Sequence, residues 1–292
     1  MKKKLTALIV AGLAVCVAAF VLTGCGSSSS SSSSESSSSS SSTASTESTA
    51  SDDDSANISE LVVGFDSEYP PYGYVDTDGS YTGFDLELAQ RVCEINGWTY
   101  KAEPIDWASK DAQLGSGVIN CIWNGFTMEG REGEYTFSEP YMKNGQVIVV
   151  KADSGISSLA DLADKTVITQ ADSAALKVLE GDQKELADTF KELQTIKDYN
   201  NAFMQLESGA VDAVACDLSI AAYQMSAKEG TFAQLDESLS EENYAVGFKL
   251  GDQALADKVT EALKQMDADG EVEALCEKYA DQGISYSNWV LK

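Results

Sequence analysis

From Ile58 onward, short apolar runs alternate with longer stretches whose apolar residues recur at helical spacing. The run "LVVGF" (Leu61–Phe65) predicts a buried strand. The stretch "FDLELAQRVCEIN" (Phe84–Asn96) has apolar residues at positions 84, 88, 92 and 95, which predicts a helix, and Asp85 suits its N-cap. Alternating strands and helices are typical of parallel sheets covered by helices, so the pattern predicts an α/β fold.

Two segments of the chain match each other at a constant offset of 92 residues. "DWASKDAQLGSGVINCIWNG" (Asp106–Gly125) aligns with "DYNNAFMQLESGAVDAVACD" (Asp198–Asp217), with Asp, Gln, Leu, Ser and Gly identical and Trp107 opposite Tyr199. Each segment predicts an aromatic turn, a helix, a Ser-Gly helix stop and then a strand. The repeat indicates two lobes of one design.

The repeat makes Gly125 and Asp217 equivalent strand ends. Open α/β sheets bind ligands at the carboxyl ends of their parallel strands. A third strand end lies in "TVITQADSAAL" (Thr166–Leu176), where a strand is predicted to enter a helix through Gln170–Ser173. Free backbone amides at the start of that helix would attract an anion.

Composition narrows the possible chemistry. The formal charge of −27 excludes most nucleic-acid partners, and the absence of histidine excludes His-based catalysis and the usual zinc sites. Nothing in the sequence indicates a cofactor or a metal. For Cys93, Cys121, Cys216 and Cys276, buried free thiols are the expectation, with a disulfide such as Cys93–Cys121 as the alternative.

The three strand ends together suit a free amino acid. Arg131 is one of only two arginines, and its planar fork can hold a carboxylate, with Thr127 and the amides near Ser173 sharing it. Asp217 would hold the ammonium group, helped by the Gly125 carbonyl and the Thr127 hydroxyl.

Each of these residues also has a plainer interpretation. Arg131 would then be an exposed loop arginine paired with Glu129 or Glu132, and Asp217 would cap the helix that follows it. Trp107, which with Tyr69 could pack on the apolar atoms of the ligand, would instead belong to the core. Their joint position at the strand ends of a duplicated frame favours a site.

The N-terminus carries a targeting signal. Lys2–Lys4 precede an apolar stretch that closes on "LTGC" at Cys25, which predicts a signal peptide over residues 1–24, with a retained transmembrane helix as the alternative. "LTGC" resembles the lipobox of bacterial lipoproteins, which implies a lipidated Cys25. The Ser-rich remainder of residues 25–57 has no apolar periodicity and predicts a disordered tether.

From Leu61 to about Ala280 the chain resembles the extracellular solute-binding lipoproteins (family 3 type) of bacterial polar amino-acid ABC importers. The resemblance lies in "VVGFDSEYPPYGYVDTDGSYTGFDLELA", "NGFTMEGREGEYTFSEPY", "LESGAVDAVACD" and "MDADGEVEALCEKY". It implies a two-lobe periplasmic-binding-protein-like fold of type II, each lobe a mostly parallel sheet flanked by helices, with two hinge crossings. It implies as ligand residues Asp66, Tyr69, Trp107, Asn124, Gly125, Thr127, Arg131, Gln170, Ser173, Ala174 and Asp217.

The resemblance also implies a domain layout and a function. Lobe 1 would comprise residues 58–140 and 245–292, lobe 2 residues 146–239, and the hinges residues 141–145 and 240–244. A monomer anchored by lipid to the outer face of the cell membrane would capture a polar L-amino acid and deliver it to a permease driven by an ATPase, without doing chemistry.

Other functions stay open from the sequence. One is an enzyme similar to cyclohexadienyl dehydratase, with Asp66 or Glu68 as its acid–base group; others are a surface adhesin and a sensory domain. For a binding protein, cystine, glutamine, glutamate and the basic amino acids are all compatible ligands.

Overall fold

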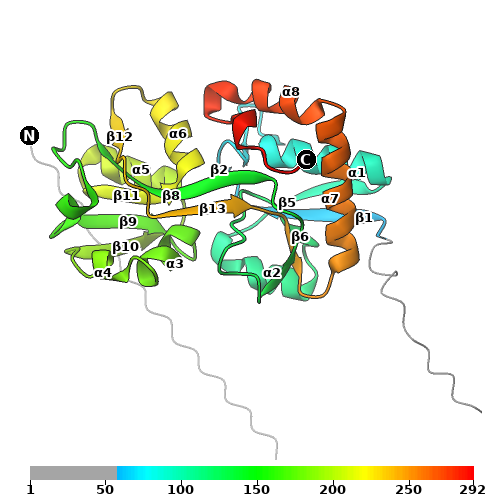
Figure 1. The fold of residues 1–292 in the computed structure, drawn as a ribbon, viewed down its shortest axis with the longest axis horizontal. Coiled ribbons are helices and arrows are strands. Elements are labelled where there is room, and N and C mark those ends of the chain that lie inside the picture. Colours follow the sequence, from blue (N-terminus) through cyan, green and yellow to red (C-terminus); the bar gives the residue numbers. More distant parts are fainter. Residues whose placement is uncertain (1–57) are drawn as a thin grey trace, which may run out of the picture. The chain divides into compact units, whose positions relative to one another are not determined.

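The computed structural model describes residues 58–292, which fold around two open β-sheets and one small three-stranded sheet (Figure 1). The predicted signal peptide, the lipidation site Cys25 and the Ser-rich tether lie outside these residues. Within residues 58–292, no helix has both the length and the apolar character that a membrane span requires.

The first open sheet has the strand order β5-β1-β6-β14-β7. β1 is parallel to β5 and β6, whereas β14 is antiparallel to β6 and β7, so all strands except β14 point the same way. The strands are β1 (Glu60–Phe65), β5 (Thr99–Pro104), β6 (Cys121–Ile122), β7 (Tyr135–Phe137) and β14 (Gly247–Lys249). The small sheet consists of β2 (Glu68–Tyr69), β3 (Gly73–Val75) and β4 (Tyr81–Thr82).

The second open sheet repeats this arrangement in the order β10-β9-β11-β8-β12. β9 is parallel to β10 and β11, and the one reversed strand is β8. The strands are β8 (Met142–Lys151), β9 (Thr166–Gln170), β10 (Glu192–Ile196), β11 (Ala213–Asp217) and β12 (Phe232–Gln234). All five residues of β11 are buried, as expected for a central strand with helices on both faces.

The chain passes between the two sheets on an antiparallel strand pair. β8 leads from the first sheet to the second and β13 (Ser240–Tyr244) leads back, with Tyr244 opposite Met142 and Ser240 opposite Gln146 (Figure 1). The segments predicted as hinges thus lie in this strand pair or, for Tyr141, directly before it.

Helices cover both sheets. α1 (Phe84–Asn96) has the predicted bounds and packs against α7 (Gln253–Ala268) over the first sheet, while α5 (Tyr199–Ser208) and α6 (Leu218–Ala227) cover the second (Figure 1). The others are η1 (Trp107–Ser109), α2 (Lys110–Ser116), η2 (Leu159–Leu162), α3 (Ala174–Glu180), α4 (Lys184–Ala187), α8 (Glu271–Lys278), η3 (Ala280–Gln282) and η4 (Tyr286–Asn288).

The two repeat segments adopt the same local structure. Asp106 and Asp198 both cap the helical turn that follows with their side chains, accepting from Ala108 N and Asn201 N. The glycines at the helix ends have nearly identical left-handed conformations, with φ 77 and ψ 17 at Gly117 and φ 77 and ψ 19 at Gly209. The predicted duplication is therefore visible in the backbone.

The predicted N-cap of α1 is wrong. The N-cap is Gly83, and Asp85 lies inside the first turn, fully buried. Its carboxylate accepts hydrogen bonds from Gly125 N, at 2.6 Å, and from the Tyr141 hydroxyl, at 2.8 Å. These two hydrogen bonds connect α1 to the segment after β6 and to the start of the strand crossing. They take the place of the predicted local cap.

Candidate functional site

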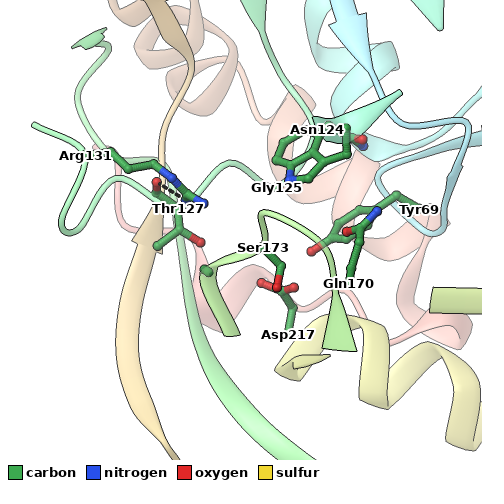
Figure 2. A pocket seen from close by; sticks show the side chains of 10 residues that line it. Tyr69, Asn124, Gly125, Thr127, Arg131, Gln170, Ser173 and Asp217 are labelled. Carbon is green, nitrogen blue, oxygen red and sulfur yellow. Dashed lines mark hydrogen bonds between the residues drawn. The ribbon is translucent and has the colours of Figure 1, made fainter. Parts of the chain in front are cut away.

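A cavity lies where the strand ends of the two open sheets face each other (Figure 2). Its atom-free space is about 280 Å³. Ten of the eleven predicted ligand residues line it: Tyr69, Trp107, Asn124, Gly125, Thr127, Arg131, Gln170, Ser173, Ala174 and Asp217. The eleventh, Asp66, lies beside it, and its carboxylate accepts from Gln170 Nε2 at 2.7 Å.

At one end of the cavity, Arg131 is buried, with 5% of its surface exposed. Its Nη1 donates to the Thr127 carbonyl oxygen at 2.9 Å (Figure 2). Its guanidinium lies 4.8 Å from the centre of the Phe126 ring. No carboxylate among residues 58–292 forms an ion pair with it, and Glu129 instead accepts from the Asn243 side chain. The interpretation of Arg131 as an exposed, paired loop arginine is therefore wrong.

The start of α3 borders the same space. β9 ends at Gln170, the chain turns through Asp172 with φ 60, and the Ser173 side chain caps α3 by accepting from Leu176 N. Ala174, the first residue of the helix, lines the cavity. The strand-to-helix junction predicted from "TVITQADSAAL" is thus present.

Gly125 lies shortly after β6, at a position where the backbone and the neighbouring rings favour glycine. It has φ 58, a conformation that favours glycine, and a Cβ there would come within 3.1 Å of the Tyr69 and Tyr244 rings. Its N–H is held by Asp85.

Asp217 is buried at the end of β11, with 4% exposed. Its Oδ1 accepts from Asn144 Nδ2 at 2.9 Å, from Gln146 Nε2 at 2.7 Å and from the Tyr244 hydroxyl at 2.9 Å. Asp217 is the N-cap residue of α6 by position, but its side chain makes no capping hydrogen bond, so capping does not account for the buried carboxylate. Burial raises the pKa of the Asp217 carboxyl.

Sequence reasoning missed Glu242, a buried carboxylate next to Asp217. Its Oε1 accepts from Thr127 Oγ1 at 2.8 Å and from Asn144 Nδ2 and Gln146 Nε2, both at 2.7 Å. Burial, and then the charge of Asp217, raise the pKa of the Glu242 carboxyl to about 7. Nothing in "SEENY" separates Glu242 from its exposed neighbour Glu241; the face that it occupies follows from the pairing of β13 with β8.

The two carboxylates repel each other. Asp217 Oδ1 and Glu242 Oε1 are no more than 5.4 Å apart, twice the 2.7 Å that joins each to Gln146 Nε2. Two full charges about 5 Å apart at an effective dielectric constant of about 20 would repel by about 3 kcal/mol. Both amide groups turn their N–H toward the acids, and their carbonyl oxygens, Asn144 Oδ1 and Gln146 Oε1, lie buried without partners.

Trp107 joins the two sides of the cavity. Its indole Nε1 donates to the Asp172 carbonyl oxygen at 3.2 Å, and its ring meets Phe126 edge-on at 5.7 Å. Nearby, the Lys110 ammonium pairs with the Asp172 carboxylate. Trp107 thus packs against Phe126 and also forms part of the cavity wall. The interpretation as a core residue and the interpretation as a ligand-packing residue therefore do not exclude each other.

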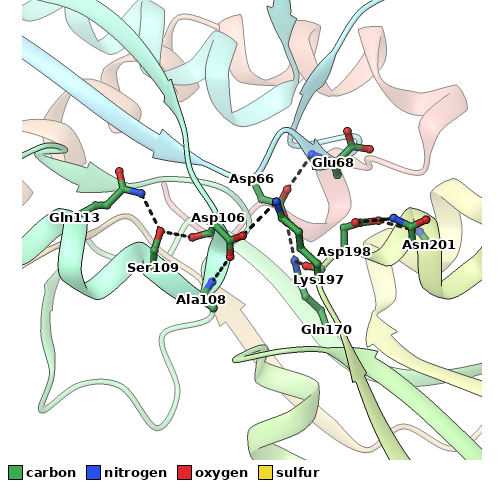
Figure 3. Close-up of polar contacts among 10 residues, drawn as sticks. All are labelled: Asp66, Glu68, Asp106, Ala108, Ser109, Gln113, Gln170, Lys197, Asp198 and Asn201. Carbon is green, nitrogen blue, oxygen red and sulfur yellow. Dashed lines mark hydrogen bonds and ion pairs between the residues drawn. The ribbon is translucent and has the colours of Figure 1, made fainter. Parts of the chain in front are cut away.

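The Asp66 end of the cavity is also polar (Figure 3). Besides Gln170, the Asp66 carboxylate accepts from Glu68 N at 2.9 Å, and burial raises its pKa. Lys197 makes an ion pair with Asp106 at 3.2 Å next to this group. Asn124 accepts from Asp66 N at 2.7 Å and so fixes the loop that carries Asp66.

The four cysteines of the described residues, Cys93, Cys121, Cys216 and Cys276, are buried and free. Burial raises the pKa of each thiol, so they are expected to remain protonated and unreactive.

Known relatives resemble this chain over most of its length. The L-cystine-binding protein TcyJ of Escherichia coli K12 is 29% identical over 222 residues, which cover 75% of this chain and 82% of TcyJ. The arginine-binding extracellular protein ArtP of Bacillus subtilis 168 is 29% identical over 283 residues, which cover 96% of this chain and 98% of ArtP.

A solved structure extends the likeness to three dimensions. The substrate-binding protein of an ABC uptake transporter from Streptococcus pneumoniae, with bound histidine, is 33% identical, with a TM-score of 0.74 over 78% of this chain and 95% of that chain. This likeness confirms the predicted type II periplasmic-binding-protein fold. The family model of the bacterial extracellular solute-binding proteins, family 3, matches residues 61–282, and the chain belongs to that family.

Proposed function

We propose that this protein is the substrate-binding component of an ABC importer and captures a polar L-amino acid between its two lobes. The observation that carries the proposal is that two buried charged groups at one cavity, a guanidinium and a carboxyl, each lack an ion-pair partner among residues 58–292. Arg131 has no anionic partner and Asp217 no cationic partner among residues 58–292. Burying such groups is costly unless a ligand of opposite charges compensates them.

A free amino acid supplies both missing charges. Its carboxylate would lie against Arg131 and the first amides of α3, and its ammonium group against Asp217, the Gly125 carbonyl and the Thr127 hydroxyl oxygen, whose own proton is donated to Glu242. Trp107 and Tyr69 would pack on its apolar atoms, while Asn124, Gln170 and Asp66 would face the end of its side chain. The prediction that the Thr127 hydroxyl shares the ligand's carboxylate is not kept, because that hydroxyl donates its proton to Glu242.

Capture would proceed by closure. We propose that residues 58–140 and 245–292 form lobe 1, that residues 146–239 form lobe 2, and that β8 and β13 act as the hinge. The ligand would first meet lobe 1, and closure would bring Asp217 and Ser173 against it. Contacts from both lobes favour the closed state, which the permease would then recognise.

The remaining parts of the proposal concern location and partners. The family is extracellular, so the domain works outside the cytoplasm. We propose that Cys25 is lipidated and that residues 26–57 tether the domain to the outer face of the cell membrane. The protein would act as a monomer with a permease and an ATPase, and would do no chemistry on its ligand.

Thermal unfolding of the purified protein, screened against the amino acids and cystine, tests the proposal. A ligand at about 100 times its dissociation constant should stabilise the folded state by about 2.7 kcal/mol. Arg131→Ala should weaken binding by at least about 30-fold, since losing one partner of a buried charge pair costs about 2 kcal/mol or more.

Arg91→Ala is the matched control, because the other arginine forms only the surface ion pairs with Glu94 and Glu271. We expect it to bind like the wild type. If no amino acid stabilises the wild type, and mass spectrometry of the denatured protein finds no retained amino acid, the proposed function is wrong.

A further inference from the structure

Glu242 adds a second carboxylate to the end of the cavity where the ligand's ammonium group would bind. It is 5% exposed, and two amide groups, Asn144 Nδ2 and Gln146 Nε2, each donate to it and to Asp217. Thr127 Oγ1 donates to Glu242 as well. Because the Thr127 proton is used in this way, the lone pairs of its hydroxyl oxygen remain for a donor in the cavity.

Glu242 also borders a second cavity. This cavity shares Thr127, Arg131 and Ala174 with the first, and its atom-free space of about 780 Å³ includes open solvent. A proton that leaves Glu242 therefore has a path to solvent.

No cation of the described residues offsets the two acids. Neither Asp217 nor Glu242 has a lysine or arginine of residues 58–292 within ion-pair distance. The titratable groups that face Asp217 and Glu242 are the phenols of Tyr69, Tyr72, Tyr199 and Tyr244 and the thiol of Cys216, and burial raises the pKa of each of them. The charged groups around the two cavities are the guanidinium of Arg131 and the side chains of Glu129, Lys177, Asp182 and Glu241. Lys143, next to Asn144 in β8, is exposed.

We propose that Glu242 is the second carboxylate of the ammonium subsite and that the Asp217–Glu242 pair exchanges one proton for the ammonium group of the ligand. Without ligand, the pair holds a proton, because two carboxyl groups that share the same amide donors repel each other when both are ionised. When the ammonium group arrives, it supplies the compensating charge, and the proton leaves for bulk water. This inference rests on the proposed function.

The exchange predicts a linkage between pH and affinity. Since the ammonium group binds the fully ionised pair more tightly than the protonated pair, the dissociation constant should fall as pH rises through the pKa of about 7 at Glu242. One exchanged proton with that pKa corresponds to a decrease of roughly eightfold between pH 6 and pH 7.5. The chain contains no histidine, so no imidazole titrates in this range.

Isothermal titration calorimetry tests the exchange directly. The amino acid found by the thermal screen is titrated at pH 6 and 7.5 in pairs of buffers with different ionisation enthalpies, which yields the number of protons released per ligand. We expect the wild type to release up to one proton, and Glu242→Gln, which keeps size but cannot ionise, to release fewer and to show a flatter pH dependence.

Asp85→Asn is the matched control, because Asp85 is the other buried carboxyl near the cavity with a pKa raised to about 7. It should keep the wild-type proton release. Amino-acid binding without proton release in the wild type would overturn the inference while leaving the proposed function intact. It would be equally overturned if Asp85→Asn abolished the release and Glu242→Gln did not. The wild-type titration alone decides the exchange if Glu242→Gln does not fold.

Discussion

The substitution Asp85→Asn measures how much free energy of unfolding is lost when a buried carboxyl in the first turn of α1 ionises. Asp85 is fully buried and accepts from Gly125 N and from the Tyr141 hydroxyl. An asparagine has the same shape, and its amide oxygen can accept from Gly125 while its N–H₂ donates to Tyr141. The substitution therefore removes the ionisation and keeps the contacts.

The sign of the effect follows from linkage. The carboxyl has a pKa of 3.8 in the unfolded chain, and burial raises it to about 7 in the folded protein. Between these values the unfolded chain releases a proton that the folded protein keeps. The stability that protonated Asp85 contributes is thus fully present below pH 3.8 and is lost as pH rises through about 7.

The magnitude is large enough to measure. Each unit between the two pKa values corresponds to about 1.4 kcal/mol, so the full loss is about 4 kcal/mol. About 3 kcal/mol of it falls between pH 5 and pH 8. All other titrating groups are shared by the wild type and the variant, so they cancel in the difference.

Urea unfolding of both proteins at pH 5 and pH 8 is the assay. The free energy of unfolding of Asp85→Asn minus that of the wild type should increase by about 3 kcal/mol from the lower to the higher pH. A constant offset from altered hydrogen bonds does not affect this change. A difference that is the same at both pH values would refute the assignment of the raised pKa to burial of Asp85.

Two further substitutions test the backbone at α1 and the contact across the cavity. Gly83→Ala should lower the free energy of unfolding in urea by about 3 kcal/mol or more, because φ is 140 and the new Cβ would lie 2.2 Å from the Tyr72 carbonyl oxygen. The control Gly79→Ala, with φ 88 and open space around the new Cβ, should lower it by only about 1 kcal/mol. Equal losses in the two variants would contradict this reasoning. Asp172→Asn removes the ion-pair partner of Lys110, whose side chain is 3% exposed. Closure would then bury an unpaired ammonium group, so amino-acid binding measured by calorimetry should weaken about tenfold. Unchanged affinity would show that the ion pair does not favour closure.

The sequence by itself determined the elements and their repetition. Phe84–Asn96 is a helix with the predicted bounds, since its apolar residues at helical spacing form a face that the sheet covers. The offset of 92 residues correctly paired the turn at Gly117 with the turn at Gly209, because a glycine after a helix adopts the left-handed conformation from local sterics alone. The resemblance to a known family named ten residues that line one cavity.

Only the tertiary structure decided the partners of the buried charges. Asp85 looked like a helix cap but bonds to Gly125 and Tyr141, which are 40 and 56 residues away. Nothing in the sequence separates Glu242 from the neighbouring acids, yet in the structure it is joined to Asp217 through amides on β8. Local patterns fix which face of an element is apolar, whereas the partner of a buried polar group depends on which distant segments the chain crossings bring within hydrogen-bond distance.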